Sequence, residues 1–76
     1  MTPSDLDAAL ITAHEAGDLP QLVALYSQAA EGASGEEAQA FYLTQAMVFA
    51  LEAGDPKAQA LNAQLVAMGR ATPLGC

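Results

Sequence analysis

The residues that could do acid–base chemistry are few. His14 is the one histidine of the sequence, and Glu15 and Asp18 follow it closely, so a general base can be imagined at this point. No nucleophile and no phosphate-binding glycine loop accompanies it. A single imidazole near a helix C-terminus is more typical of a surface residue that interacts with the helix dipole. We therefore predict no catalytic residue and a protein that is not an enzyme.

The other carboxylates and the cysteine do not suggest a metal site. Helical di-iron proteins use Glu-x-x-His pairs, which are absent here, and the acids at positions 15, 18, 52 and 55 fall where helix ends and caps are expected. Glu36 and Glu37 are explained as first-turn charges of a helix. Cys76 is the one cysteine, so it cannot form a disulfide within the chain, although oxidation could couple two chains through it. We expect no metal and no cofactor.

The formal net charge of −7 restricts the partners. Nine carboxylates stand against Lys57 and Arg70, which excludes nucleic acid as a partner and disfavours anionic membranes. The longest nearly apolar run, residues 41–51, is shorter than the roughly 20 residues that cross a bilayer. Acidic residues near the N-terminus, where a signal peptide carries positive charge, predict a cytoplasmic protein. The excess of alanine is typical of GC-rich bacterial genomes.

A six-residue pattern occurs twice and predicts the architecture. Ala-His-Glu-Ala-Gly-Asp at 13–18 returns as Ala-Leu-Glu-Ala-Gly-Asp at 50–55, 37 positions later, and each copy lies between two apolar helical patterns. The glycine can take the left-handed conformation of a helix C-cap, and the aspartate can cap the next helix. Each Gly-Asp pair therefore predicts the corner of a helix hairpin. The expected fold is all-α, with two antiparallel helix hairpins in series.

Local signals set the bounds of four expected helices, at 3–16, 19–30, 34–53 and 56–69. Pro3 and Pro56 suit the first position of a helix, and Ser34 with Glu37 forms a capping-box pattern for the third helix. Residues 1–70 are expected to form one four-helix domain, with hairpin one at 3–31 and hairpin two at 34–69. Residues 71–76 are expected to be a flexible tail.

Apolar spacing predicts which side of each helix is buried. The expected core stripes are Leu6, Ala9, Leu10 and Ala13; Leu22, Leu25, Tyr26 and Ala29; Leu43, Ala46, Met47 and Ala50; and Ala58, Leu61, Leu65 and Met68. The third helix is apolar nearly all round, which predicts a central position. Because 18 of the 76 residues are alanine, the core has little area, and a second copy of the chain could supplement it.

This arrangement resembles the tetratricopeptide repeat family, whose unit is two antiparallel helices with small residues and Gly-Asp or Gly-Asn at the turn. Matching the hairpin glycines puts the core stripes on the family's packing positions. The spacing of 37 exceeds the usual 34, and the family's early aromatic residue is replaced by Leu6 and Leu43. The chain is similar to the family as a repeat-like protein of two units.

The resemblance implies a peptide-binding groove lined by the first helix of each pair. Carried over by position, the groove would show Asp7, Ile11, His14, Glu15, Phe41, Thr44, Val48, Leu51 and Glu52. An apolar floor with an acidic rim suits an amphipathic segment that carries basic residues. The other interpretation is that Phe41 and Val48 are core, because neighbouring helices flank the third helix.

We therefore predict a protein–protein interaction module that forms a homodimer and binds a partner segment in a groove between the first and third helices. The alternative is a small acidic inhibitor or antitoxin-like regulator that masks a basic protein surface. Tyr26 is expected in the core with its hydroxyl at the edge, and Tyr42 at the surface. The residues predicted for the partner-binding or dimer face are Ile11, His14, Phe41, Tyr42, Val48, Phe49 and Leu51.

Overall fold

Four helices and no strand make up residues 3–70, the part of the chain that the computed structural model describes. The helices are α1 (Pro3–Ala16), α2 (Leu19–Glu31), α3 (Glu36–Ala53) and α4 (Lys57–Ala67). The all-α prediction is confirmed, and the expected helix bounds agree to within two residues. The predicted tail at 71–76, with Cys76, lies outside the described residues.

Both Gly-Asp pairs turn the chain as predicted. Gly17 and Gly54 have φ values of 64° and 67°, in the left-handed region that favours glycine. In each copy the amide of the aspartate donates to the carbonyl five residues earlier, at 3.0 Å for Asp18 and 2.8 Å for Asp55. The two corners are therefore closed by the same hydrogen bond.

The aspartates also cap the helices that follow, although not identically. The Oδ1 atom of Asp18 accepts from the amide of Gln21 at 3.3 Å, as expected for an N-cap. Asp55 accepts from the amide of Lys57 at 2.9 Å, and Pro56 occupies the cap position. The fourth helix therefore begins at Lys57, one residue after the predicted first residue, Pro56.

The predicted capping box at the start of α3 is wrong. The residue at the cap position is Gly35, with extended backbone and no side-chain cap hydrogen bond. The box needs the serine directly before the first helical residue, so Ser34 and Glu37 are out of register by one position. Glu36 and Glu37 do lie in the first turn, where their charge complements the helix dipole.

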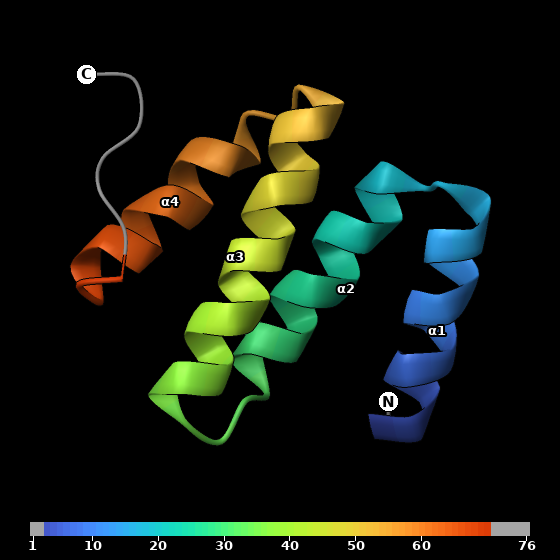
Figure 1. Cartoon of the computed structure of the whole chain (residues 1–76), viewed down its shortest axis with the longest axis horizontal. Coiled ribbons are helices and arrows are strands. Elements are labelled where there is room, and N and C mark those ends of the chain that lie inside the picture. Colours follow the sequence, from blue (N-terminus) through green and yellow to red (C-terminus); the bar gives the residue numbers. More distant parts are fainter. Residues whose placement is uncertain (1–2, 71–76) are drawn as a thin grey trace.

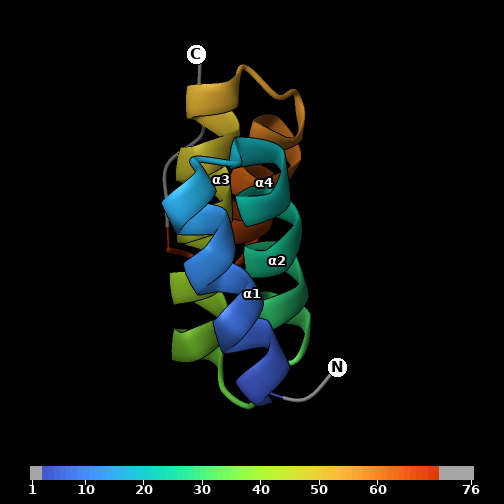
Figure 2. The same cartoon turned by 90° about the vertical axis from the view of Figure 1, so that its right-hand side faces the viewer.

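The helices lie side by side in chain order, as one layer (Figure 1). Within the described residues, only consecutive helices have backbones in contact: α1 with α2, α2 with α3, and α3 with α4. The layer measures 36 × 28 × 13 Å, and a view turned by 90° shows the helices overlapping along its length (Figure 2). The layer thus has two edges, α1 and α4, and α3 is flanked on both sides.

The core fills the angles between neighbouring helices and is rich in alanine. The larger cluster joins α2, α3 and α4 and consists of Val23, Ala30, Ala40, Leu43, Ala46, Ala50, Ala58, Leu61 and Leu65. The smaller cluster joins α1 and α2 through Ala13, Leu22 and Leu25. Ala46 and Ala50 have no exposed surface, so their small side chains let the neighbouring helices approach α3 closely. Of the predicted core stripe of the third helix, Leu43, Ala46 and Ala50 are buried, and Met47 is half-buried against them.

Candidate functional site

The outer side of α3 exposes large apolar side chains. Phe41, Val48 and Leu51 are 56%, 39% and 51% exposed, and with Thr44 they follow one another at intervals of three and four residues. We call these four residues the α3 stripe. The hydroxyl of Thr44 donates to the carbonyl of Ala40 at 2.8 Å, so the helix itself satisfies this polar group. The α3 stripe is therefore a continuous, mostly apolar surface about three turns long.

The interpretation that Phe41 and Val48 are core is wrong. Leu43, Ala46 and Ala50 point into the core, and the helical period places the α3 stripe on the opposite side. α2 and α4 flank α3 within the layer, and the core residues that they share with it do not include Phe41 or Val48. No described helix lies over the outer side.

Five rings form a chain of contacts from α1 to α3. His14 meets Phe49 edge to face at a centroid distance of 5.5 Å, and the ring of Tyr26 stacks on Phe49 at 5.7 Å. Tyr42 lies 6.3 Å from Tyr26 and 5.4 Å from Phe41. We call these five residues the ring cluster. Because the backbones of α1 and α3 are not in contact, its side chains join these two helices.

A hydrogen bond adds to the ring contacts at the α1 end. The Nε2 atom of His14 and the hydroxyl of Tyr26 are 2.9 Å apart, and which of them donates depends on the imidazole tautomer. His14 is exposed and lies in the last turn of α1. The imidazole therefore has both a hydrogen-bond partner and two aromatic neighbours.

The predicted face residues divide into two groups. Among the described residues the exposed large apolar side chains are Ile11, Phe41, Val48 and Leu51, all of which the sequence placed on this face. Tyr42 and Phe49 are half-buried and pack against the core, so the prediction of Tyr42 as a surface residue holds only in part. Tyr26 is also half-buried, and its place in the ring cluster was not predicted.

The groove predicted between the first and third helices is bridged where His14 meets Phe49. A hollow of about 130 Å³ lies elsewhere, between α2, α3 and α4, and is lined by Ser27, Ala30, Glu31, Gln39, Leu43, Leu61 and Gln64. The exposed apolar surface therefore consists of the α3 stripe, and Ile11 is separately exposed on α1, one turn before His14.

Charge is distributed unevenly around this surface. Residues 3–31 carry five carboxylates and no lysine or arginine, whereas residues 32–70 carry four carboxylates with Lys57 and Arg70. Glu37 lies one turn before Phe41, and Glu52 lies one turn after Val48, and both are exposed. The α3 stripe thus has a glutamate at each end.

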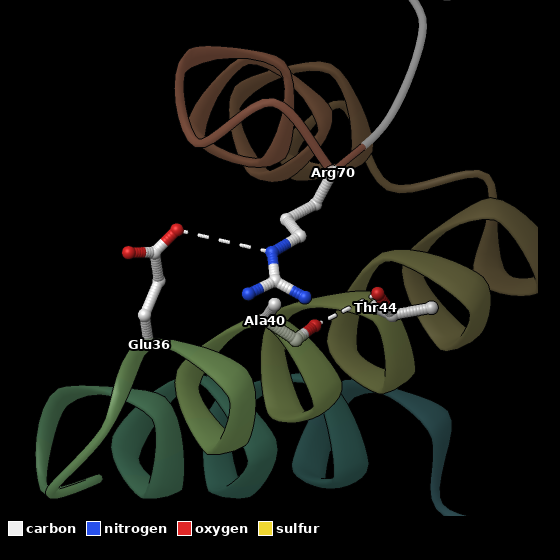
Figure 3. Close-up of polar contacts among 4 residues, drawn as sticks. All are labelled: Glu36, Ala40, Thr44 and Arg70. Atoms are coloured by element: carbon white, nitrogen blue, oxygen red, sulfur yellow. Dashed lines mark hydrogen bonds and ion pairs between the residues drawn. The ribbon is translucent and has the colours of Figure 1, made fainter.

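One of the two described cations forms an ion pair with a carboxylate of α3. The Nε atom of Arg70 lies 3.8 Å from Oε1 of Glu36. Figure 3 shows the arginine reaching from the end of α4 to the side of α3 that carries Ala40 and Thr44. This ion pair offsets charge on the α4 side of the stripe, whereas residues 3–31, which include α1, contain no lysine or arginine.

Residues 3–70 contain no group of three or more His, Cys, Asp or Glu side chains placed to hold a metal ion. None of the four described helices combines the length and the apolar character needed to span a membrane. In comparisons with protein-family models, curated proteins and solved structures, nothing matches this chain. The resemblance to the tetratricopeptide repeat family stays a prediction.

Proposed function

We propose that the protein is a non-enzymatic protein-interaction module and that the α3 stripe is its docking surface. The observation that carries the proposal is the exposure of Phe41, Val48 and Leu51 on one side of a single helix. Single exposed apolar residues are normal on protein surfaces, but clustered ones mark contact sites. Their clustering on a helix of a chain this small favours docking.

The fold does not need these side chains where they are. The opposite side of α3 supplies Leu43, Ala46 and Ala50 to the core, and the outer side faces water. Neither core cluster contains Phe41, Val48 or Leu51, and polar residues at these positions would avoid exposing apolar surface. These apolar side chains would be buried in a contact with another molecule, whereas the isolated chain leaves them exposed.

The surroundings of His14 favour binding over catalysis. Its Nε2 atom is paired with the hydroxyl of Tyr26, and its ring packs on Phe49. These contacts give His14 a structural role, which is to link α1 to the rest of the layer. A catalytic role would need a nucleophile or a polar cavity beside it.

A second candidate is an acidic regulator that masks a basic protein surface. The observation that favours it is the composition of residues 3–31, which contain five carboxylates and no lysine or arginine. In that case binding would depend on hairpin one and would be largely indifferent to the α3 stripe. The predicted homodimer would use the same surface, with the α3 stripe of one copy contacting a second copy.

Site-specific photo-crosslinking in the source cell tests the proposal. A photoreactive phenylalanine analogue replaces Thr44, in the α3 stripe, and the matched control carries it at Ala63, an exposed position of α4. We expect adducts from position 44 that are absent at position 63. A self-adduct would have twice the 7.8 kDa mass of the chain and would identify the homodimer.

The same experiment can refute the proposal. No adduct at position 44, or the same adducts at both positions, would mean that the α3 stripe is not a docking surface. Adducts confined to a third probe at exposed Glu15, on hairpin one, would favour the acidic regulator instead.

A further inference from the structure

The α3 stripe has the dimensions of a helix-docking surface. Phe41 and Leu51 are ten residues apart, which corresponds to about 15 Å along a helix axis. The apolar side chains between these ends are spaced by about one turn. A helix that lies along the stripe can match it with apolar residues at i, i+3 or i+4, and i+7.

The charges at the ends of the stripe bear on its occupant. Glu37 and Glu52 flank the apolar residues, and Glu15 follows the histidine that joins α1 to α3. The described cations lie on the α4 side, where Glu36 already pairs with Arg70. The end glutamates and the α1 side therefore favour basic groups on an occupant.

A second copy of the chain fits these charges poorly. Packing two α3 helices in parallel brings Glu37 of one copy towards Glu37 of the other. Packing them antiparallel, with Phe41 opposite Leu51, brings Glu37 near Glu52 of the other copy. Each orientation opposes like charges at the ends of the apolar contact, and each copy carries a formal charge of −7.

We infer that the occupant of the α3 stripe is an amphipathic helix of another protein, with lysine or arginine residues flanking its apolar side. The inference rests on the proposed docking function and specifies the partner of that surface. The apolar side chains supply the contact area, and the flanking glutamates select a basic partner over an acidic one. The basic residues of the partner lie over the α1 side of the stripe and not over α4.

Three synthetic peptides of about 14 residues test this inference. An isolated helix of this length is only marginally stable in water, so helix-capping residues are added to each peptide. The first has leucines at helical spacing and lysines beside them. The second has the same leucines with glutamates in place of the lysines. The third has the composition of the first in an order that scatters the leucines around the helix. Binding to the full chain is measured by the anisotropy of a neutral fluorophore on each peptide.

We expect the lysine peptide to bind about tenfold or more tightly than the glutamate peptide at low salt, because several exposed charge pairs act together. The difference should shrink as salt rises from about 20 to about 300 mM, because the screening length falls. The scrambled peptide should bind more weakly than the ordered lysine peptide, since its leucines do not meet the stripe together.

Two variants with a matched charge change locate the effect. Glu52→Gln removes a carboxylate beside the α3 stripe, and Glu31→Gln removes one at the end of α2. The two positions are matched because both glutamates are exposed and lie in the last turn of a helix. We expect Glu52→Gln to weaken the lysine peptide about two- to fivefold and Glu31→Gln to change it much less. Val48→Ser should weaken both ordered peptides, and circular dichroism confirms that each variant is folded.

Each remaining outcome contradicts the inference in a distinguishable way. If the lysine and glutamate peptides bind equally and Val48→Ser weakens both, the docking surface stands but the basic partner does not. If neither peptide binds and the chain sediments as a dimer that salt strengthens, the occupant is a second copy. If the lysine peptide binds but is insensitive to Val48→Ser, binding is purely ionic and the acidic-regulator candidate is favoured. If nothing binds and position 44 forms no adduct, the proposed function fails as well.

Discussion

Two leucines on α3 give a direct test of which side of this helix faces water. Leu43 belongs to the core and is 3% exposed, whereas Leu51 in the α3 stripe is 51% exposed. The same substitution, leucine to alanine, removes the same atoms at both positions and changes the helix propensity equally. Any difference in stability between the two variants therefore reports burial.

The structure sets the expected size of each effect. Leu43→Ala leaves a cavity between closely packed helices, and we expect it to lower the free energy of unfolding by about 2–5 kcal/mol. At Leu51 about half of the side chain is already in water and no closed cavity forms, so we expect a loss of about 1 kcal/mol or less. The total stability of a chain of this length is only about 4–11 kcal/mol, so Leu43→Ala removes a large part of it.

Urea unfolding followed by far-ultraviolet circular dichroism measures both variants beside the unmodified chain. The measurement is made at low and at high micromolar protein concentration, because a dimer would make the stability depend on concentration. Equal losses for Leu43→Ala and Leu51→Ala would refute the assignment of the α3 stripe to the surface. A loss for Leu51→Ala that grows with protein concentration would show that a second copy covers this residue.

Three further variants test the corner at Gly54, the end of α2 at Gly32, and the link to α1. Gly54→Ala should lower the stability by about 1–2 kcal/mol, because alanine is strained at φ 67° although nothing lies within 4 Å of the added Cβ. Gly32 at the end of α2 has φ −89°, which alanine adopts without strain, so Gly32→Ala should instead raise the stability by about 0.4–1 kcal/mol. Thermal unfolding of both variants checks that the two effects have opposite signs. Tyr26→Phe removes the hydroxyl that pairs with His14 and should lower the stability by at most about 1 kcal/mol. Relative to the unmodified chain, amide hydrogen exchange should accelerate more in α1 than in α3. Equal acceleration in both helices would contradict the link.

The helices and corners could be predicted because local sequence determines them. The left-handed glycine and the aspartate that follows it act within one turn of the chain, and both copies behave alike at Gly17 and Gly54. The start of α3 was harder to predict because Ser34 and Gly35 are both acceptable cap residues. The chain places Gly35 at the cap, and a pattern of residue types does not reveal this shift of one position.

The identity of the open side of α3 depended on tertiary packing. Spacing predicted the buried stripe, but because apolar residues surround this helix the sequence left open whether Phe41 and Val48 were also core. The alanines at 46 and 50 permit close approach of neighbouring helices on the side that also buries Leu43, and no described helix covers Phe41 and Leu51. The contact of Tyr26 with His14 depends on how α1 crosses α2, which no spacing in the sequence records.

α3 exposes more large apolar side chains than stability alone would favour. Large apolar residues stabilise a fold most when they are buried, yet α3 leaves Phe41, Val48 and Leu51 exposed, while Leu43 and several alanines fill its core side. Positions at which a chain departs from the rule of local consistency are expected to be functional sites. If a partner helix covers the α3 stripe, the apolar surface contributes only in the complex, and saturating partner should raise the unfolding temperature. Because the partner would bind only the folded layer, this stabilisation should grow with the logarithm of its concentration and should be reduced by Val48→Ser.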